Sequence, residues 1–129
     1  MIVGTGVDII EIERFANWHG YSEKQLCKLF SPQEIAYCCA DTQKSAQRFA
    51  VRFALREALY KAIRVAAPEC RIPFLTLCKA ITIAGAPQTP PKVIFNWHIV
   101  PDLDPATKIH FSLSHSKTTA IAQVILERA

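Results

Sequence analysis

The spacing of the hydrophobic residues changes once along this chain, close to Pro68. Before that proline, apolar residues recur at helical spacing, most clearly at Phe49, Ala50, Phe53 and Ala54. After it they alternate with polar residues, as in strands that are buried on one face. A first strand, several helices and then a run of antiparallel strands predict an α+β fold rather than a doubly wound sheet.

Capping residues and prolines indicate where the expected helices begin and end. Short helices are expected over Ile12–His19 and, opened by a capping box at Ser22, through about Leu29. Another helix should start at Ser31-Pro32-Gln33-Glu34, which offers an N-cap serine, a proline at the first helical position and a glutamate at the third. One long central helix is predicted from about Thr42 to Val65, ended by Pro68.

The expected strands are bounded by glycine, proline and aspartate. In Ile2–Ile10, Gly4 and Gly6 would permit another backbone to approach closely. Residues 85–87 and 102–105 are predicted turns. The later strands are predicted over Thr76–Ala84, Lys92–His98, Ile109–Ser114 and Thr119–Leu126.

The length and the charge of the chain bound its function. The 129 residues favour a single domain over residues 1–129, with one core but little room to enclose a deep pocket, so a site shared between subunits is expected. A net charge of +4 is mildly basic, short of the dense clustering typical of a dedicated nucleic-acid binder. It suits an acidic ligand or an acidic protein partner.

Neither a membrane segment nor a cysteine framework is indicated. No apolar run approaches the roughly 20 residues that span a bilayer, and no secretory signal pattern opens the chain, so a cytosolic protein is expected. The five cysteines are odd in number and contain no C-x-x-C pair. They are interpreted as reduced, mostly buried thiols, with a catalytic cysteine as an alternative that no spacing supports.

Three residues predict a cation site beside a phosphate site. Glu57 and Lys61 are four residues apart, so they share one helix face, and Asp8 lies near the end of the first strand. Two carboxylates and a lysine are a usual way to hold a hard divalent metal and the phosphate that it carries. The alternative is a plain Glu57–Lys61 salt bridge, but Asp8 would then need a partner of its own.

Two further groups of polar residues stand out. Arg48, Arg52 and Arg56 recur every fourth residue, which fits either a phosphate-binding ridge or a solvated helix flank. His115 follows a predicted strand among serines and Lys117, where it is either a functional residue or an ordinary loop residue.

Four short motifs, in order along nearly the whole chain, resemble the small bacterial holo-acyl-carrier-protein synthases of the 4'-phosphopantetheinyl transferase family. The opening Gly6-Val7-Asp8-Ile9 with Ile12 and Arg14 is similar to G-x-D-I-x-x-I-x-R, and Phe30–Glu34 with Tyr37 to F-[ST]-x-x-E-x-x-Y. Residues 52–62 resemble R-F-A-x-K-E-A-x-x-K-A, and Ser112–Ser116 resembles S-[IL]-[ST]-H-[ST]. The resemblance implies the fold of that family.

The resemblance also implies a chemistry and a set of residues. Mg²⁺ would be held by Asp8 and Glu57 with the pyrophosphate of coenzyme A, and Lys61 would contact the phosphate or the leaving group. A serine of apo-acyl carrier protein would attack the β-phosphate, with Glu57 as the base, and release adenosine 3',5'-bisphosphate in support of fatty acid biosynthesis. The implied coenzyme-binding residues are Arg52, Arg56, Lys61, Ser114 and His115.

The partners follow from the same resemblance. A homotrimer with active sites between subunits is implied. Acyl carrier proteins are acidic, so Arg14, Lys24 and Lys28 are candidate docking residues. Neither a nucleic-acid nor a membrane partner is expected.

The chain departs from the family pattern in two places. Arginine stands at position 56 where lysine is usual, and an arginine cannot serve as a proton shuttle. The glycines that usually follow the K-A pair are absent after Lys61-Ala62, so the coenzyme contacts of that loop in the family cannot be carried over to this chain.

Two other functions compete with a transferase. A small basic nucleic-acid-binding module would use the net charge and the arginine stripe, but the strands lack interleaved exposed aromatic residues. A metal-dependent phosphohydrolase would use the same carboxylates, and the sequence separates it poorly from a transferase.

Overall fold

The computed structural model describes residues 1–85 and 89–129. Its strands are β1 (Ile2–Glu11), β2 (Ile81–Ala84), β3 (Lys92–Phe95), β4 (Lys108–His115) and β5 (Thr119–Glu127). Its α-helices are α1 (Glu23–Leu26), α2 (Pro32–Cys39), α3 (Ser45–Ala66) and α4 (Phe74–Lys79). Short 3₁₀ helices occupy η1 (Ile12–Phe15), η2 (Trp18–Gly20) and η3 (Trp97–Ile99).

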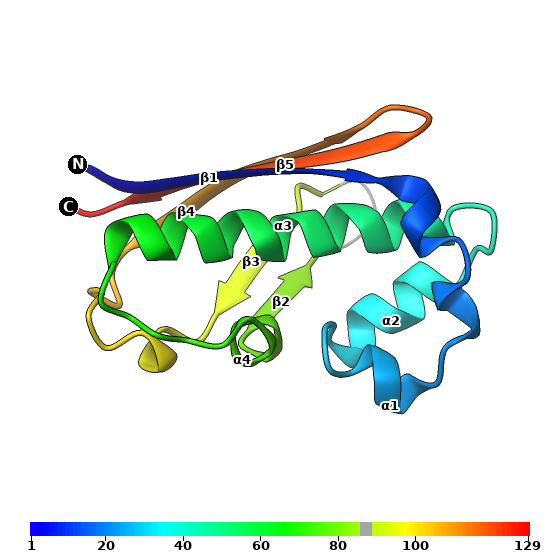
Figure 1. Ribbon diagram of the computed structural model, residues 1–129, viewed down its shortest axis with the longest axis horizontal. Helices are drawn as coiled ribbons and strands as arrows, with labels where there is room; N and C mark the ends of the chain where they lie inside the picture. The colour runs from blue at the N-terminus through cyan, green and yellow to red at the C-terminus, as the bar shows by residue number, and fades with distance from the viewer. Residues whose placement is uncertain (86–88) are drawn as a thin grey trace.

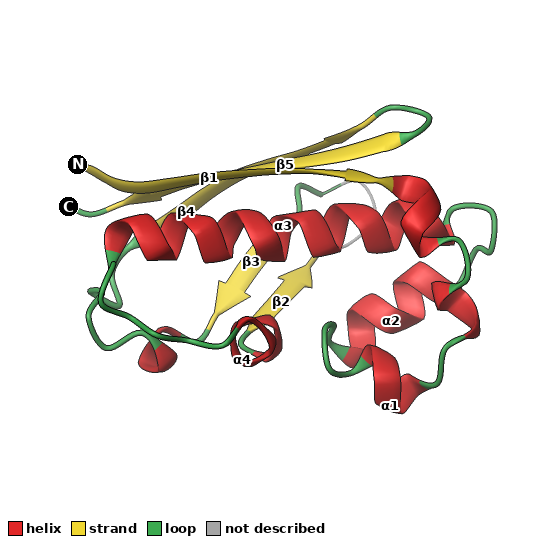
Figure 2. Ribbon diagram, viewed as in Figure 1, coloured by secondary structure: helices red, strands yellow, loops and turns green. Residues whose placement is uncertain are grey.

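The long helix α3 is the middle layer of the molecule. Strands β1, β5 and β4 form an antiparallel sheet in that order, and β2 pairs with β3 in a separate antiparallel sheet. Figure 1 shows α3 lying along one face of the three-stranded sheet, with β2, β3, α4, α1 and α2 beyond it. All four α-helices lie on that side of the sheet (Figure 2), and no described element covers the opposite face. The predicted α+β fold is confirmed.

The predicted helix ends are largely confirmed. The central helix begins three residues later than predicted and ends at Ala66. Ser22 and Gln25 form the predicted capping box of α1. At α2, the Ser31 hydroxyl accepts from the Glu34 backbone N–H as predicted and donates to the Glu34 carboxylate, which also pairs with Arg56.

Three predicted elements differ in the structure. Residues 76–79, predicted as strand, belong to helix α4, because Phe74, Leu77 and Cys78 share one helix face that packs into the core. The helix predicted over Ile12–His19 is two short 3₁₀ helices. The strand predicted to reach His98 ends at Phe95, where Asn96 caps η3. The turn predicted at 85–87 falls largely outside the described residues.

A seam of small residues joins β1 to α3. A Cβ atom added at Gly6 would overlap the carbonyl oxygen of Ala58, and one added at Gly4 would overlap that of Ala62. Ala58 and Ala62 are themselves fully buried. The expected close backbone approach at the two glycines is therefore confirmed, and strand and helix run in opposite directions along this seam.

We predict that Gly6→Ala destabilises the protein, because the added methyl group must force β1 away from α3. Overpacking of this kind typically costs about 1–3 kcal/mol in the free energy of unfolding, which urea denaturation measures. Gly20→Ala is the matched control, since a Cβ at Gly20 would meet no atom within 4 Å. Equal unfolding free energies for the two variants would contradict the close contact between β1 and α3 at Gly6.

Candidate active site

The seam brings Asp8 beside helix α3. Side chains alternate along a strand, so Gly4, Gly6 and Asp8 share the face of β1 that meets the helix. The ammonium nitrogen of Lys61 lies 3.2 Å from Oδ1 of Asp8 and donates to the backbone oxygen of Val7 at 3.0 Å. The Asp8 side chain is 16 % exposed. Lys61 therefore forms its ion pair with Asp8 across the seam, rather than with Glu57 along the helix.

Glu57 lies one helical turn before Lys61, and the charges of Asp8 and Lys61 both affect its pKa. Burial raises the pKa of Glu57, and the negative charge of Asp8 raises that pKa further. The positive charges of Lys61 and Arg14 lower it in part. Asp8 and Glu57 are thus close enough to repel each other, and a cation between them would relieve the repulsion.

The donor set fits a magnesium ion held jointly with a ligand. Among residues 1–85 and 89–129, no group of three or more histidine, cysteine, aspartate or glutamate side chains could hold a metal by itself. Mg²⁺ is usually bound through one or two carboxylates plus substrate phosphates. Asp8 and Glu57 would supply the two carboxylates, and the half-exposed Lys61 ammonium lies beside Asp8, where it would meet a phosphate oxygen.

Arg56 has a different environment from the one expected of a coenzyme contact. Its side chain has no exposed surface and forms a two-point ion pair with Glu34, at 2.8 and 2.9 Å. It also donates to the backbone oxygens of Ile81 and Cys78. The residue therefore connects α2 and β2 to α3. Because Arg56 is buried, the series Arg48, Arg52 and Arg56 is not a solvated flank along its whole length.

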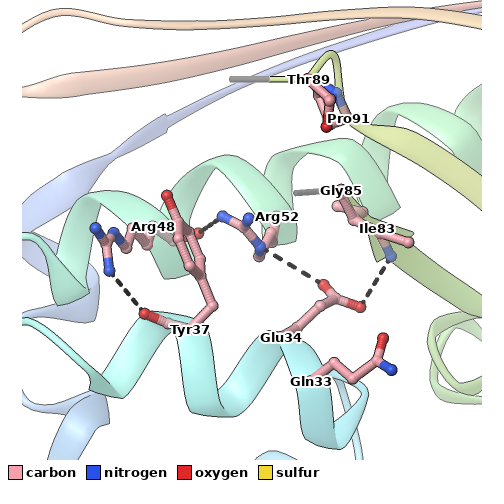
Figure 3. A pocket seen from close by; sticks show the side chains of 10 residues that line it. Gln33, Glu34, Tyr37, Arg48, Arg52, Ile83, Gly85, Thr89 and Pro91 are labelled. Carbon is pink, nitrogen blue, oxygen red and sulfur yellow. Dashed lines mark hydrogen bonds and ion pairs between the residues drawn. The ribbon is translucent and has the colours of Figure 1, made fainter. Parts of the chain in front are cut away.

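Arg52 lines a cavity between α2, α3 and β2. The cavity measures about 580 Å³, and Figure 3 shows Arg52 and Glu34 facing each other within it. The Nε of Arg52 is buried 3.9 Å from the Glu34 carboxylate, and it has no hydrogen-bond partner among residues 1–85 and 89–129. The lining residues are Gln33, Glu34, Tyr37, Arg48, Arg52, Ile83, Ala84, Gly85, Thr89 and Pro91.

Ser114 and His115 lie elsewhere, at the exposed end of β4. His115 lines a second hollow together with Ile12, Gln43, Ala46, Gln47, Ser116 and Lys117. Its Nε2 lies 2.8 Å from the amide nitrogen of Gln47. The expected nucleotide contacts Arg52 and His115 therefore line separate hollows of one chain.

Sequence reasoning missed several residues around these hollows. Tyr37 carries Arg48 and Arg52 over its ring, at 4.0 and 4.6 Å from the ring centroid. The every-fourth spacing of the arginines marked the helix face, but no local signal placed Tyr37 against it. Glu34 was expected to cap a helix, and no local signal paired it with Arg56, which is 22 residues distant.

The expected docking residues and thiols are placed as follows. Arg14, Lys24 and Lys28 are exposed, and Arg14 also lies over the ring of Phe53 at 5.1 Å.

All five cysteines are free, with Cys38 and Cys78 buried. Burial raises the pKa of each of these two thiols to about 12, so neither is a reactive thiolate near neutral pH. In the described part of the chain, no helix is long and apolar enough to cross a membrane.

Known proteins similar to this chain share its length and its architecture. The family model of the 4'-phosphopantetheinyl transferase superfamily matches residues 4–125. A holo-[acyl-carrier-protein] synthase of Treponema denticola is 33 % identical, over 98 % of this chain and 99 % of the relative. A crystal structure of the Bacillus anthracis holo-(acyl-carrier-protein) synthase in complex with CoA (3',5'-ADP) is 28 % identical with a TM-score of 0.72, covering 100 % and 99 %. The Helicobacter pylori synthase in complex with coenzyme A is 27 % identical with a TM-score of 0.69, covering 95 % and 99 %.

Glu57 gives the stability of the protein a predictable pH dependence. Because its pKa is raised by folding, the native state holds the Glu57 proton at pH values where the unfolded chain has released it. The free energy of unfolding of the wild type, relative to Glu57→Gln, should therefore fall between about pH 4 and about pH 7. Urea unfolding in metal-free buffer at both pH values measures this difference.

The exposed Glu69 supplies the control for that comparison. Glu69→Gln should keep a nearly constant stability difference from the wild type across the same pH range. A Glu57→Gln difference that is equally constant would contradict the repulsion between Asp8 and Glu57.

Proposed function

The chain belongs to the 4'-phosphopantetheinyl transferase superfamily, and from this premise we propose that it transfers 4'-phosphopantetheine from coenzyme A to a serine of apo-acyl carrier protein. The product released is adenosine 3',5'-bisphosphate, and the activity supports fatty acid biosynthesis. The observation that carries the proposal is the placement of Asp8, Glu57 and Lys61 together at the β1–α3 seam.

The site residues suit phosphoryl transfer, which depends on neutralising charge and aligning the reacting groups. Asp8 and Glu57 would hold Mg²⁺. When bound, the ion supplies positive charge to the pyrophosphate of coenzyme A. Lys61 lies beside both carboxylates, so its ammonium would contact an oxygen of the departing phosphate.

The balanced step begins at the carrier serine. Its Oγ forms a bond to the β-phosphorus, and the bond from that phosphorus to the oxygen bridging to the α-phosphate breaks. Adenosine 3',5'-bisphosphate leaves with the electron pair of that bond. The serine proton goes to the Glu57 carboxylate, which is proposed as the general base.

The carrier is proposed to dock through Arg14, Lys24 and Lys28. All three are exposed, and Arg14 lies near enough to Glu57 to lower its pKa. An acidic carrier bound over these residues would present its serine close to the proposed base. We also propose a cytoplasmic location, which suits five free thiols.

A homotrimer is proposed to complete the site. Val7 and Ile9 are 54 % and 68 % exposed on the face of the three-stranded sheet that no described element covers, and Ile9 pairs with the exposed Ile121. A second and a third copy of this chain would cover these apolar residues. Contacts across subunits would let Arg52, Ser114 and His115 reach one coenzyme, although Arg52 and His115 line separate hollows of one chain.

We predict that the wild-type protein adds a phosphopantetheine group to apo-acyl carrier protein in the presence of coenzyme A and Mg²⁺, as a mass gain of the carrier measured by mass spectrometry. Glu57→Gln should slow this gain by at least about 100-fold, because it removes both a metal ligand and the base. Glu69→Gln, at an exposed glutamate, is the matched control.

A wild-type rate in the Glu57→Gln variant would contradict the assignment of the metal and the base. No mass gain with any of several carriers would contradict the transferase. If the coenzyme were nevertheless consumed with release of phosphate, the chain would be a phosphohydrolase.

We further predict that Ile9→Glu converts a trimer into monomers, because it places a charge on the uncovered apolar face. Sedimentation velocity measures the assembly state, and the transfer assay should lose its activity in parallel. Ile94→Glu is the matched control, since Ile94 is 60 % exposed but lies in β3, outside the three-stranded sheet. A monomeric and active wild type would overturn the shared site.

A further inference from the structure

Tyr37 stands between two arginines at the edge of the cavity between α2 and α3. The guanidinium carbons of Arg48 and Arg52 lie 4.0 and 4.6 Å from the centroid of its ring. In the view of Figure 3 the ring separates the two arginine side chains. Two cations one helical turn apart repel each other, and the electron-rich face of an aromatic ring between them offsets that repulsion.

Hydrogen bonds fix the same two side chains from the backbone. Arg48 Nη1 donates to the carbonyl oxygen of Tyr37 at 2.8 Å, and Arg52 Nη1 donates to that of Arg48 at 3.1 Å. Each guanidinium is therefore held by one hydrogen bond and by the ring, and among the described residues its terminal nitrogens make no other hydrogen bond. An arginine held in this way loses less conformational freedom on binding than a free one.

The charge of the cavity is not balanced. Glu34 is the only acidic residue among the described residues that line it. Its carboxylate is engaged by Arg56 through two hydrogen bonds and by the backbone N–H of Ile83. Within the described part of the chain, Arg48 and Arg52 thus lack a full counter-charge, and the buried Nε of Arg52 has no hydrogen-bond partner. An anion with several acceptor oxygens, such as a phosphate group, matches these donors.

We infer that Arg48 and Arg52 together bind a phosphate group of the coenzyme, and that Tyr37 is the positioning residue that holds both guanidinium groups ready for it. Arg48 is a further binding residue beyond those that the family resemblance implies. The identity of the ligand rests on the proposed function. The phosphate site itself rests on the cavity, its charges and its contacts.

Four variants test the inference. Tyr37→Leu removes the ring, whereas Tyr37→Phe keeps it, and Arg48→Lys keeps the charge without the flat guanidinium. Arg64→Lys is the matched control, because Arg64 also lies over a tyrosine ring of α3, that of Tyr60, but outside the cavity. Calorimetry with adenosine 3',5'-bisphosphate gives the Kd, and the transfer assay gives KM for coenzyme A and kcat.

If Tyr37 positions the two arginines, its loss should weaken binding of the coenzyme without slowing turnover. Tyr37→Leu and Arg48→Lys should raise Kd and KM about tenfold, the loss of about one charge-assisted contact, with kcat within about twofold of the wild type. Tyr37→Phe should restore wild-type values, and Arg64→Lys should leave them unchanged. Thermal unfolding of each variant verifies that it is folded, and Arg48→Lys tests the site even if Tyr37→Leu does not fold.

Two results separate this inference from the proposed function. Wild-type Kd and KM in folded Tyr37→Leu and Arg48→Lys would overturn the two-arginine site and leave the transferase standing. Binding of the bisphosphate that depends on Tyr37 and Arg48, in a protein that modifies no carrier, would support the site and contradict the transferase.

Discussion

The close contact between β1 and α3 is the constraint on which the rest of the structure depends. Only glycines at positions 4 and 6, opposite the buried Ala58 and Ala62, allow the strand to lie directly on the helix. Because side chains alternate along β1, the same contact brings Asp8 to the helix face that carries Glu57 and Lys61. The two carboxylates then repel each other, and Lys61 forms an ion pair with Asp8. The packing of β1 on α3 thus brings two negative charges together, and a bound cation would reduce their repulsion.

A second constraint is the buried ion pair between Glu34 and Arg56. Isolated buried charges cost several kcal/mol, so each of these residues requires the other. Arginine suits a permanent pair because it does not lose its proton in proteins. The pair joins α2, α3 and β2, and it occupies the only carboxylate among the described residues that line the cavity. Arg48 and Arg52 are consequently left with positive charge and with Tyr37 between them, which is the basis of the phosphate site inferred there.

Local signals predicted what depends on local physics. The capping serines, the long central helix and the strands at both ends of the chain follow from caps, proline and hydrophobic spacing, and they are confirmed. Residues 76–79 of helix α4 were predicted as strand because so short a segment fits either period, and the contacts of α4 with α3 decide between them. Arg56 could not be distinguished from Arg48 and Arg52, since spacing along one helix does not reveal which side chain meets a distant carboxylate. The separation of Arg52 from His115 likewise depends on tertiary structure.

We propose that Asp8 and Glu57 together hold a divalent cation in the presence of coenzyme A. Electron paramagnetic resonance of Mn²⁺, a spectroscopic substitute for Mg²⁺, measures the free ion directly during a titration with protein and coenzyme. The account predicts that the wild type with coenzyme A removes the free-ion signal, and that Asp8→Asn and Glu57→Gln each restore it at the same concentrations. Undiminished Mn²⁺ binding in both variants would contradict the claim.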